Sequence, residues 1–313
     1  MRITDSYMSS NFINNLQSNL KNLSKVQNQL SSLKEVSKSS DNPMLVSEIM
    51  DLNNSMIQNE EYMNTIEDSI DFSNMQDTAY DAATKSMSRI RTLIQQAGTD
   101  TVNNEDRQLI KAEVAAEIQT LTDALNTNFG GKYVFSGMET TTKPFTFSTE
   151  KDENGKMIGL TYAGTNDEDV SGNLTRRIAP GVQIELRTDG RKLLNEQGAN
   201  GEKDNLGTFL SDVLSALENG DVSALSGDLL ARADKEIDNV VTQRAENGAI
   251  FNRLEASKER NTSENLNLES MRSDKQDIDL AEKFMEYTME QTAYQASLAM
   301  GTKILSTSIL DYI

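Results

Sequence analysis

Glycine is distributed unevenly along the chain, and its positions restrict where regular helices can form. No glycine precedes Gly98, and after Gly248 the only one is Gly301, whereas 12 of the 17 glycines lie between Gly130 and Gly207. Glycine destabilises the interior of a helix and is favoured in turns. The distribution therefore predicts long helices towards both ends of the chain, with turns and strands in the middle.

Capping signals divide the N-terminal part into separate helices. A first segment with apolar residues at a 3–4 spacing indicates a coiled-coil-like helix. Asn42 suits the N-cap of a second helix and Pro43 its first helical position. No breaker follows until the end of this helix near Ala97, and Asn103 or Asn104 is expected to cap a third helix.

The C-terminal part predicts two further long helices. Helical pattern resumes near Leu206, and a segment from about 228 to 275 contains hardly a breaker. The last segment, from 278 onwards, again has apolar residues at a 3–4 spacing, with the polar Gln291 inside the stripe. Both ends of the chain therefore carry apolar stripes of the same kind.

Short β-like runs alternate with turns in the middle of the chain. Asn154-Gly155 is a strong signal for a two-residue hairpin. The β-like runs are 133–135, 145–147, 158–162 and 182–186.

These patterns predict a mostly α fold. It consists of a long antiparallel helical rod with coiled-coil N- and C-terminal helices and a small inserted β-rich domain. The expected domains are a terminal coiled-coil polymerisation domain (1–42 plus 278–313), a helical rod domain (43–140 plus 205–277) and a β-rich outer domain (141–204).

The composition argues against most chemical functions. The chain has 30 basic and 49 acidic residues, and a net charge of −19 disfavours nucleic acid or an anionic membrane as a partner. It has no Cys and no His, which removes the thiolate and the commonest general base and metal ligand. We therefore expect no enzyme activity and no cofactor.

One acidic region contains the residue types of a calcium site. Residues 152–154 and 167–169 offer carboxylate and amide oxygens, which are the ligands that Ca²⁺ prefers. The EF-hand ligand spacing is missing, so solvated turn residues are the preferred interpretation and no metal site is expected.

The N-terminus lacks the apolar segment of a secretory signal peptide. Nor does the sequence contain a run of about 18 apolar residues, the length of a membrane span. These features predict a cytoplasmic protein, or one exported by a route that needs no cleaved signal.

The apolar stripes at the two ends are interpreted as polymerisation elements. An ordinary helical-bundle core is the general explanation for such stripes, but these lie at the chain ends, where chains usually fray. The C-terminal stripe also ends in a largely apolar run, Ile309-Leu310-Asp311-Tyr312-Ile313. The predicted assembly interface comprises Ile13, Leu16, Leu20, Leu23, Leu30, Phe284, Tyr287, Tyr294, Leu298 and Leu305.

The residues at both ends resemble a known family. The serine-rich N-terminal stretch ending in Ser40-Asp41-Asn42-Pro43 looks like the start of bacterial flagellins, and 278–313, with Ala293-Tyr294-Gln295-Ala296, is similar to their terminal helix. Two further patterns resemble the flagellar hook-associated protein 3 family within the flagellin superfamily. These are 126–137 followed by Pro144-Phe145, and 244–249 followed by 252–255.

The resemblance implies a structural subunit at the junction between the flagellar hook and the flagellin filament. The implied partners are copies of itself, hook-associated protein 1, flagellin, the flagellar type III export apparatus and an export chaperone. The implied location is extracellular, in the flagellum, without a cleaved signal peptide. Two alternatives remain open: a flagellin filament subunit, and a cytoplasmic coiled-coil scaffold.

Overall fold

The computed structural model describes residues 2–99, 102–151, 157–163, 172–194 and 205–310. It divides into two compact units, which are described separately. Unit one comprises Met1–Glu60 and Ser263–Ile313, and unit two comprises Glu61–Thr262. The prediction of a mostly helical chain with long terminal helices and a few small antiparallel strand pairs is confirmed. The three-part division into 1–42 plus 278–313, 43–140 plus 205–277, and 141–204 stays a prediction.

Four long helices follow the capping and breaker signals closely. Asn42 Oδ1 accepts a hydrogen bond from the Leu45 backbone N–H at 3.2 Å, as expected for the cap of a helix that begins at Pro43. Asn103 caps the third helix by accepting from the Asp106 backbone N–H. The four long helices are α1 (Arg2–Ser32), α2 (Pro43–Ala97), α7 (Asp228–Gln276) and α8 (Leu280–Leu310).

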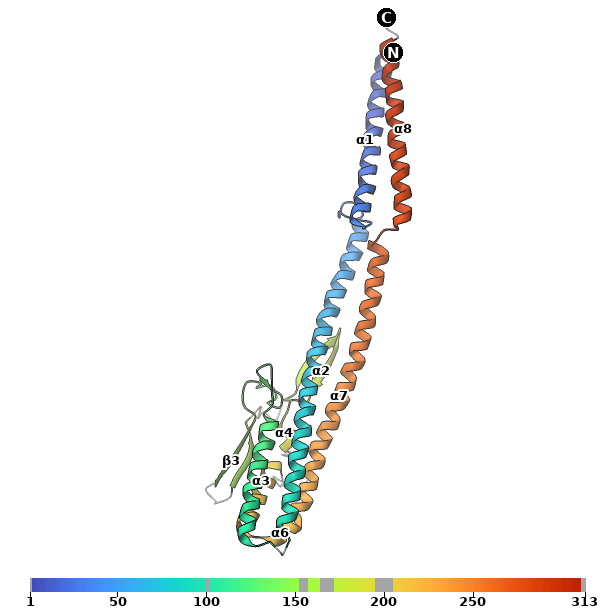
Figure 1. Cartoon of the computed structure of the whole chain (residues 1–313). Coiled ribbons are helices and arrows are strands. Elements are labelled where there is room, and N and C mark those ends of the chain that lie inside the picture. The colour runs from blue at the N-terminus through green and yellow to red at the C-terminus, as the bar shows by residue number, and fades with distance from the viewer. Residues whose placement is uncertain (1, 100–101, 152–156, 164–171, 195–204, 311–313) are drawn as a thin grey trace. The chain divides into compact units, whose positions relative to one another are not determined.

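In unit one, α1 and α8 lie side by side and antiparallel (Figure 1). Asn19 Nδ2 donates to Ser297 Oγ at 2.9 Å, while Lys283 Nζ lies 3.2 Å from Glu35 Oε1 just beyond the end of α1. These contacts pair the middle of α1 with the middle of α8, and the residues just after α1 with the start of α8. The two ends of the chain are therefore joined into one helical pair.

The helices approach each other closely at the glycine near the C-terminus. A Cβ atom added at Gly301 would be 2.3 Å from the Phe12 ring, closer than any ordinary contact. Gly301 is buried in this position. Its lack of a side chain therefore makes room for the Phe12 ring between the two helices.

The linkers that flank this pair are also bonded to each other. The Glu35 backbone N–H donates to the Gln276 carbonyl at 2.8 Å, and Gln29 Nε2 donates to the Glu35 carbonyl at 2.6 Å. Leu33, directly after α1, has a φ of 58°. This left-handed conformation is one that glycine usually adopts at the end of a helix. Hydrogen bonding in the linker holds the chain in this turn.

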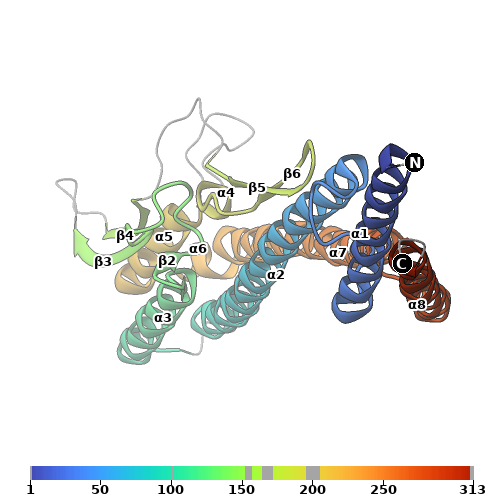
Figure 2. The same cartoon turned by 90° about the horizontal axis from the view of Figure 1, so that it is seen from above.

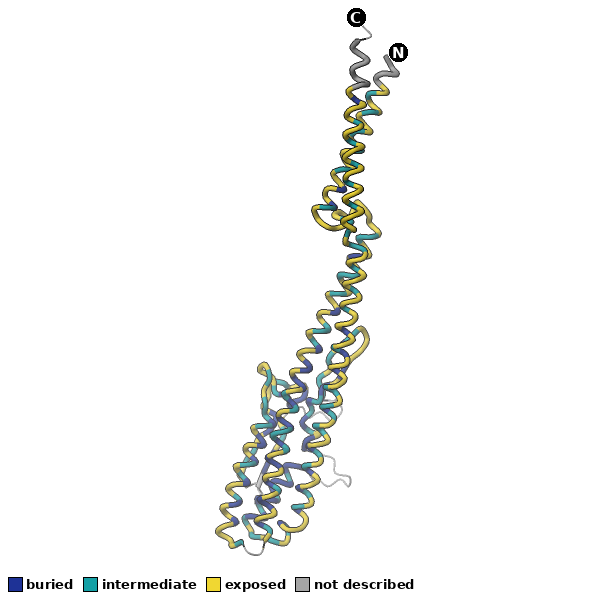
Figure 3. The backbone as a smooth tube through the Cα atoms, turned by 45° about the vertical axis from the view of Figure 1, so that its right-hand side comes forward, coloured by how far each residue is buried: buried dark blue, intermediate teal, exposed yellow. Residues whose placement is uncertain are grey.

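Unit two contains the large apolar core, which Figure 3 shows as a concentration of buried residues. Besides parts of α2 and α7, it contains residues of α3, α5 and α6, which Figure 2 shows from above, together with side chains from the strands and the segments beside them. The bounds are α3 (Asn104–Leu125), α5 (Leu206–Asn219) and α6 (Val222–Ser226). Leu93, Ile118 and Phe209 are among its fully buried side chains. Burial of apolar side chains on this scale stabilises unit two.

Polar contacts fix the register of α2 against α7 inside this unit. Asn247 Nδ2 donates to the Ser73 carbonyl at 2.9 Å, and Ser73 Oγ donates to Asn247 Oδ1 at 2.9 Å, with both residues buried. One turn away, Arg244 contacts Asp77 at 2.8 Å and Asp81 at 2.7 Å. Hydrogen bonds to these carboxylates raise the pKa of Arg244, which stays charged. The sequence pattern at 244–249 thus has a structural function in locking two helices.

Within the described residues, the strands form three separate antiparallel pairs. The pairs are β1 (Asn128–Phe129) with β2 (Lys132–Tyr133), β3 (Phe145–Lys151) with β4 (Met157–Tyr162), and β5 (Leu174–Ala179) with β6 (Val182–Leu186). A short helix, α4 (Arg191–Leu194), follows. The β3–β4 pairing agrees with the hairpin prediction, although Asn154-Gly155 lies outside the described residues. The acidic runs 152–154 and 167–169 also lie outside them.

The predicted strand at 133–135 is only partly right, since the strand ends at Tyr133. Val134 and Phe135 turn into the core instead, and the Phe135 ring packs edge-on against Tyr80 with centroids 5.0 Å apart. The Val134 carbonyl accepts from Gln76 Nε2 at 3.2 Å rather than from a neighbouring strand.

We predict that Asn247→Ala lowers the free energy of unfolding of unit two by about 2 kcal/mol, because Ser73 would keep buried polar groups without their partner. Urea denaturation of the full chain measures this. Asn252→Ala, at an exposed position of the same helix, is the control and should change the midpoint little. Equal effects of the two substitutions would contradict the assignment.

We also predict that Gly301→Val separates the end of α8 from α1, because the added side chain occupies the place of the Phe12 ring. Limited proteolysis should then cut the terminal helices at least several times faster, with unit two unaffected. Ala299→Val, at an exposed position of α8, is the matched control. Unchanged cleavage in Gly301→Val would show that the close approach does not hold the pair together.

Candidate functional site

Exposed apolar side chains gather in unit one. Of the large apolar residues that the structure shows as exposed, all but Leu109, Met138, Val182 and Val241 belong to this unit. Figure 3 shows the same contrast, since the terminal helices carry few buried residues. Exposed apolar surface on this scale marks a site of interaction with another protein.

The predicted interface residues of α1 lie on two different faces. Leu16, Leu23 and Leu30 are half-buried on the side that faces α8. Ile13 and Leu20 are 51% and 49% exposed. The single stripe expected from the sequence is thus divided between contact with α8 and a surface left open.

The predicted residues of α8 divide in the same way. Tyr287 and Tyr294 are half-buried towards α1, whereas Phe284 and Leu298 are 61% and 42% exposed. The side chain of Leu305 lies outside the described residues. Whether these residues form an interface between subunits stays a prediction.

Sequence reasoning missed several residues that face across the pair. Phe12 and Asn19 continue the inner face of α1, and Ser297 and Gly301 continue that of α8. The apolar pattern alone did not indicate the polar and glycine positions. Gly301 itself was visible as an isolated glycine within a helix, which often has a packing reason.

The contact between α1 and α8 contains many polar groups. Lys283 Nζ lies 3.2 Å from Glu35 Oε1 and 3.0 Å from Glu286 Oε2. Partial burial lowers the pKa of Lys283, but hydrogen bonds to Glu286 and Glu35 outweigh it, so the net shift is upward and the lysine is charged. Because these polar groups and Gly301 share the inner face with leucines and tyrosines that are only half-buried, the pair buries less apolar area than a continuous apolar contact would. Helices gain most of their stability from such burial.

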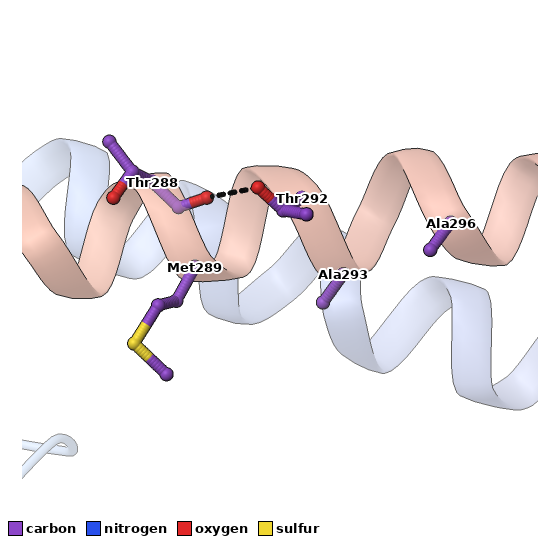
Figure 4. A pocket seen from close by; sticks show the side chains of 5 residues that line it. All are labelled: Thr288, Met289, Thr292, Ala293 and Ala296. Carbon is purple, nitrogen blue, oxygen red and sulfur yellow. Dashed lines mark hydrogen bonds between the residues drawn. The ribbon is translucent and has the colours of Figure 1, made fainter.

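A shallow hollow of about 430 Å³ lies on α8 (Figure 4). Its lining residues are Thr288, Met289, Thr292, Ala293 and Ala296. Each is exposed, and the Thr292 hydroxyl donates to the Thr288 carbonyl at 2.7 Å. The hollow thus offers small and apolar groups for packing and has no titratable side chain for catalysis.

Two other kinds of site, a metal site and a membrane-spanning helix, have requirements that the described residues do not meet. There, no group of three or more His, Cys, Asp or Glu side chains is placed to hold a metal ion. The described helices include none that is long and apolar enough to cross a membrane. Burial raises the pKa of Tyr162 to about 12, and its hydroxyl donates to the Phe135 carbonyl at 3.2 Å, so it acts as a structural group.

Comparison with known proteins gives two matches to flagellin regions. Residues 3–140 match the bacterial flagellin N-terminal helical region, and residues 230–313 match the bacterial flagellin C-terminal helical region. Together these regions span more than two thirds of the chain. They contain both terminal helices, and therefore all of the predicted interface.

The chain is also similar to individual proteins of the flagellum. It is 27% identical to flagellar hook-associated protein 3 of Escherichia coli (strain K12) over 90% of each protein. It is 26% identical to flagellin of Bacillus subtilis (strain 168), over 68% of this chain and 66% of that protein.

Two solved structures share the fold. FlgL from Bacillus cereus has a TM-score of 0.56 and 22% identity, covering 71% of this chain and 99% of that one. The flagellar junction protein FlgL from Legionella pneumophila has a TM-score of 0.56 and 14% identity, covering 74% of this chain and 100% of that one.

Proposed function

Because the chain belongs to the bacterial flagellin family, we propose that it is a structural subunit of the flagellum, forming the junction between the hook and the flagellin filament. The observation that carries this proposal is the similarity to hook-associated protein 3 over 90% of both proteins. The similarity to a flagellin is limited to about two thirds of each chain. A hook-associated protein therefore accounts for more of the chain than a filament subunit does.

The subunit acts mechanically and not as an enzyme. It assembles through the terminal helices α1 and α8, whose exposed apolar side chains would be buried between subunits. Burying such surface is the dominant favourable contribution to protein association. Unit two, with its large core and its locked α2–α7 register, supplies a stable body for each subunit.

The proposed partners follow from this position in the flagellum. They are copies of the chain, hook-associated protein 1 on the hook side and flagellin on the filament side. The protein would leave the cell through the flagellar type III export apparatus, without a cleaved signal peptide and with an export chaperone bound before export. A cytoplasmic coiled-coil scaffold is disfavoured, because it would not account for flagellin regions at both ends.

Deletion of the gene in the source organism tests the proposed junction function. We predict cells with bare hooks that shed flagellin into the medium, because filament subunits would be exported with no junction to polymerise on. Electron microscopy of the cells and an immunoblot of the medium for flagellin measure this. Bare hooks without shed flagellin would indicate that the chain is itself the filament subunit, and normal filaments would contradict the proposal.

Leu20→Asp tests assembly through the terminal helices. Because Leu20 is 49% exposed, the substitution should leave the chain folded while placing a charge in the buried contact between subunits. We predict at least a tenfold loss of cells with filaments, while export of the variant and the melting of unit two stay unchanged. Asn14→Asp, which adds the same charge at another exposed position of α1, should keep most filaments. If unit two also melted, Leu20 would belong to the core of the monomer.

A further inference from the structure

The pairing of α1 with α8 places matching positions of the two helices at the same level. Asn19 and Ser297 are hydrogen-bonded at 2.9 Å. Each residue advances the helix by about 1.5 Å, so seven residues forward on one antiparallel helix correspond to seven residues back on the other. Val26 is therefore level with Glu290. The contact of Glu35 with Lys283 at 3.2 Å, further along, agrees with this register.

The residue that follows each of these facing positions turns to one side of the pair. Successive residues rotate by about 100° around a helix axis, and since the two helices run in opposite directions, both rotations lead to the same side. On this side Leu20 and Leu298 lie one residue to either side of the Asn19–Ser297 level, about 3 Å apart along the axis. Gln27 and Gln291 lie in the same way around the level of Val26 and Glu290. We call it the layered side, because it carries a leucine layer and, one heptad away, a glutamine layer.

All four of these side chains are open to solvent. Leu20 and Leu298 are 49% and 42% exposed, and Gln27 and Gln291 are both exposed.

The opposite side of the pair has a different character. In the same register Asn15 lies within one residue of the level of Met300, and Asn22 within one residue of the level of Ala293. Each of these pairs combines a polar side chain with an apolar one. At the positions compared, matched pairs of like residues thus occur on the layered side and not on its opposite.

The segments that end at Leu20 and contain Leu298 carry no charge. Residues 6–20 of α1 and 291–302 of α8 contain no Asp, Glu, Lys or Arg, in a chain with a net charge of −19. Like-charged surfaces repel, and an interface between identical chains brings like surfaces together. The neutral end of the pair is therefore where two copies of this acidic chain can meet at the lowest electrostatic cost.

The glutamine layer also favours a second copy of this chain as the partner that packs on the layered side. A glutamine amide both donates and accepts hydrogen bonds, so glutamines from two copies can satisfy each other without a charged partner. Polar residues within an otherwise apolar helix contact lower its stability but specify its register. A register shifted away from the matched layers would bury amides against leucine, which is unfavourable.

We propose that the layered side is the face with which α1 and α8 pack against a second copy of this chain, and that Gln27 and Gln291 set the register of that contact. This inference rests on the proposed function, because it specifies which face of the terminal helices assembles and what aligns it. It adds two residues, Gln27 and Gln291, that interrupt the apolar stripes of the two helices.

Charge substitutions at and away from the glutamine layer test its contribution. Gln27→Glu and Gln291→Glu, expressed in the deletion strain, should reduce the fraction of cells with filaments at least tenfold, because each buries a carboxylate between copies. Folding is preserved, since Gln and Glu have similar helix propensities.

Two control variants add the same charge at exposed positions that point away from the layered side. Asn28→Asp on α1 and Ala299→Glu on α8 serve this purpose. Both change helix propensity little, because Asp resembles Asn and Glu is a strong helix former like Ala. Both should stay within twofold of the unmodified chain, and equal losses at layer and control positions would overturn the proposal.

Photo-cross-linking identifies the protein that packs on the layered side. With p-benzoylphenylalanine placed at Leu20, illumination of isolated flagella should give an adduct between two copies of this chain, detected by immunoblot. The same group placed at Asn28 should give at least tenfold less of it. An adduct with flagellin or another protein at Leu20, in place of a second copy, would overturn the assignment of the occupant.

The cross-linked peptide reports the register. In the unmodified background, mass spectrometry should find one predominant partner peptide. In the double variant Gln27→Leu with Gln291→Leu it should find several, because an all-apolar stripe permits shifted packing. A single predominant peptide in the double variant would show that the glutamines do not set the register.

The outcome at Leu20→Asp separates this inference from the proposed function. If Leu20→Asp abolishes filaments while Gln27→Glu and Asn28→Asp act alike, assembly through the terminal helices stands and the glutamine layer fails. If Leu20→Asp also has no effect, the proposed assembly itself is contradicted.

Discussion

The antiparallel contact between α1 and α8 is the interaction on which the proposed assembly through the chain ends depends. It joins the two ends through the close approach of Phe12 to Gly301, the hydrogen bond of Asn19 to Ser297 and the ion pair of Lys283 with Glu35. These contacts fix a register but bury little apolar surface. The pair therefore keeps leucine and phenylalanine side chains on its outside, and a second layer of packing is needed to bury them.

In unit two the chain packs its apolar side chains against one another. Its apolar side chains converge in one core, and its buried polar groups, such as Asn247 with Ser73, satisfy each other within the chain. The two units differ in how completely they bury their apolar side chains. Unit two encloses its apolar surface, whereas unit one leaves surface for other chains, as expected for a subunit that polymerises through its ends.

Much of the fold could be predicted from local signals. Pro43, Asn42 and Asn103 indicated the helix boundaries correctly, because capping and the missing proline N–H act within a few residues. Strand β5 was missed, since Leu174–Ala179 carries two arginines and exposes alternate residues, which weakens the apolar signal. The turn at Val134 and Phe135 was missed because contacts with α2, distant in sequence, determine it.

The candidate surface was less predictable than the helices that carry it. An apolar residue at a 3–4 spacing can face a partner helix or lie beside that face, and Leu16 and Leu20 have these two different positions. Only the residues opposite, such as Ser297 and Gly301, decide between them. The flagellin-like patterns indicated the function more directly than any stripe, because they specify positions along the whole chain.

Electron cryomicroscopy of the hook–filament boundary in isolated flagella tests the central claim most directly. Assembly as proposed predicts a layer of this chain between hook and filament, in which Leu20 and Leu298 of each copy are buried against a neighbouring copy. Finding the chain distributed along the filament, or finding these side chains open to solvent in the assembled layer, would contradict it.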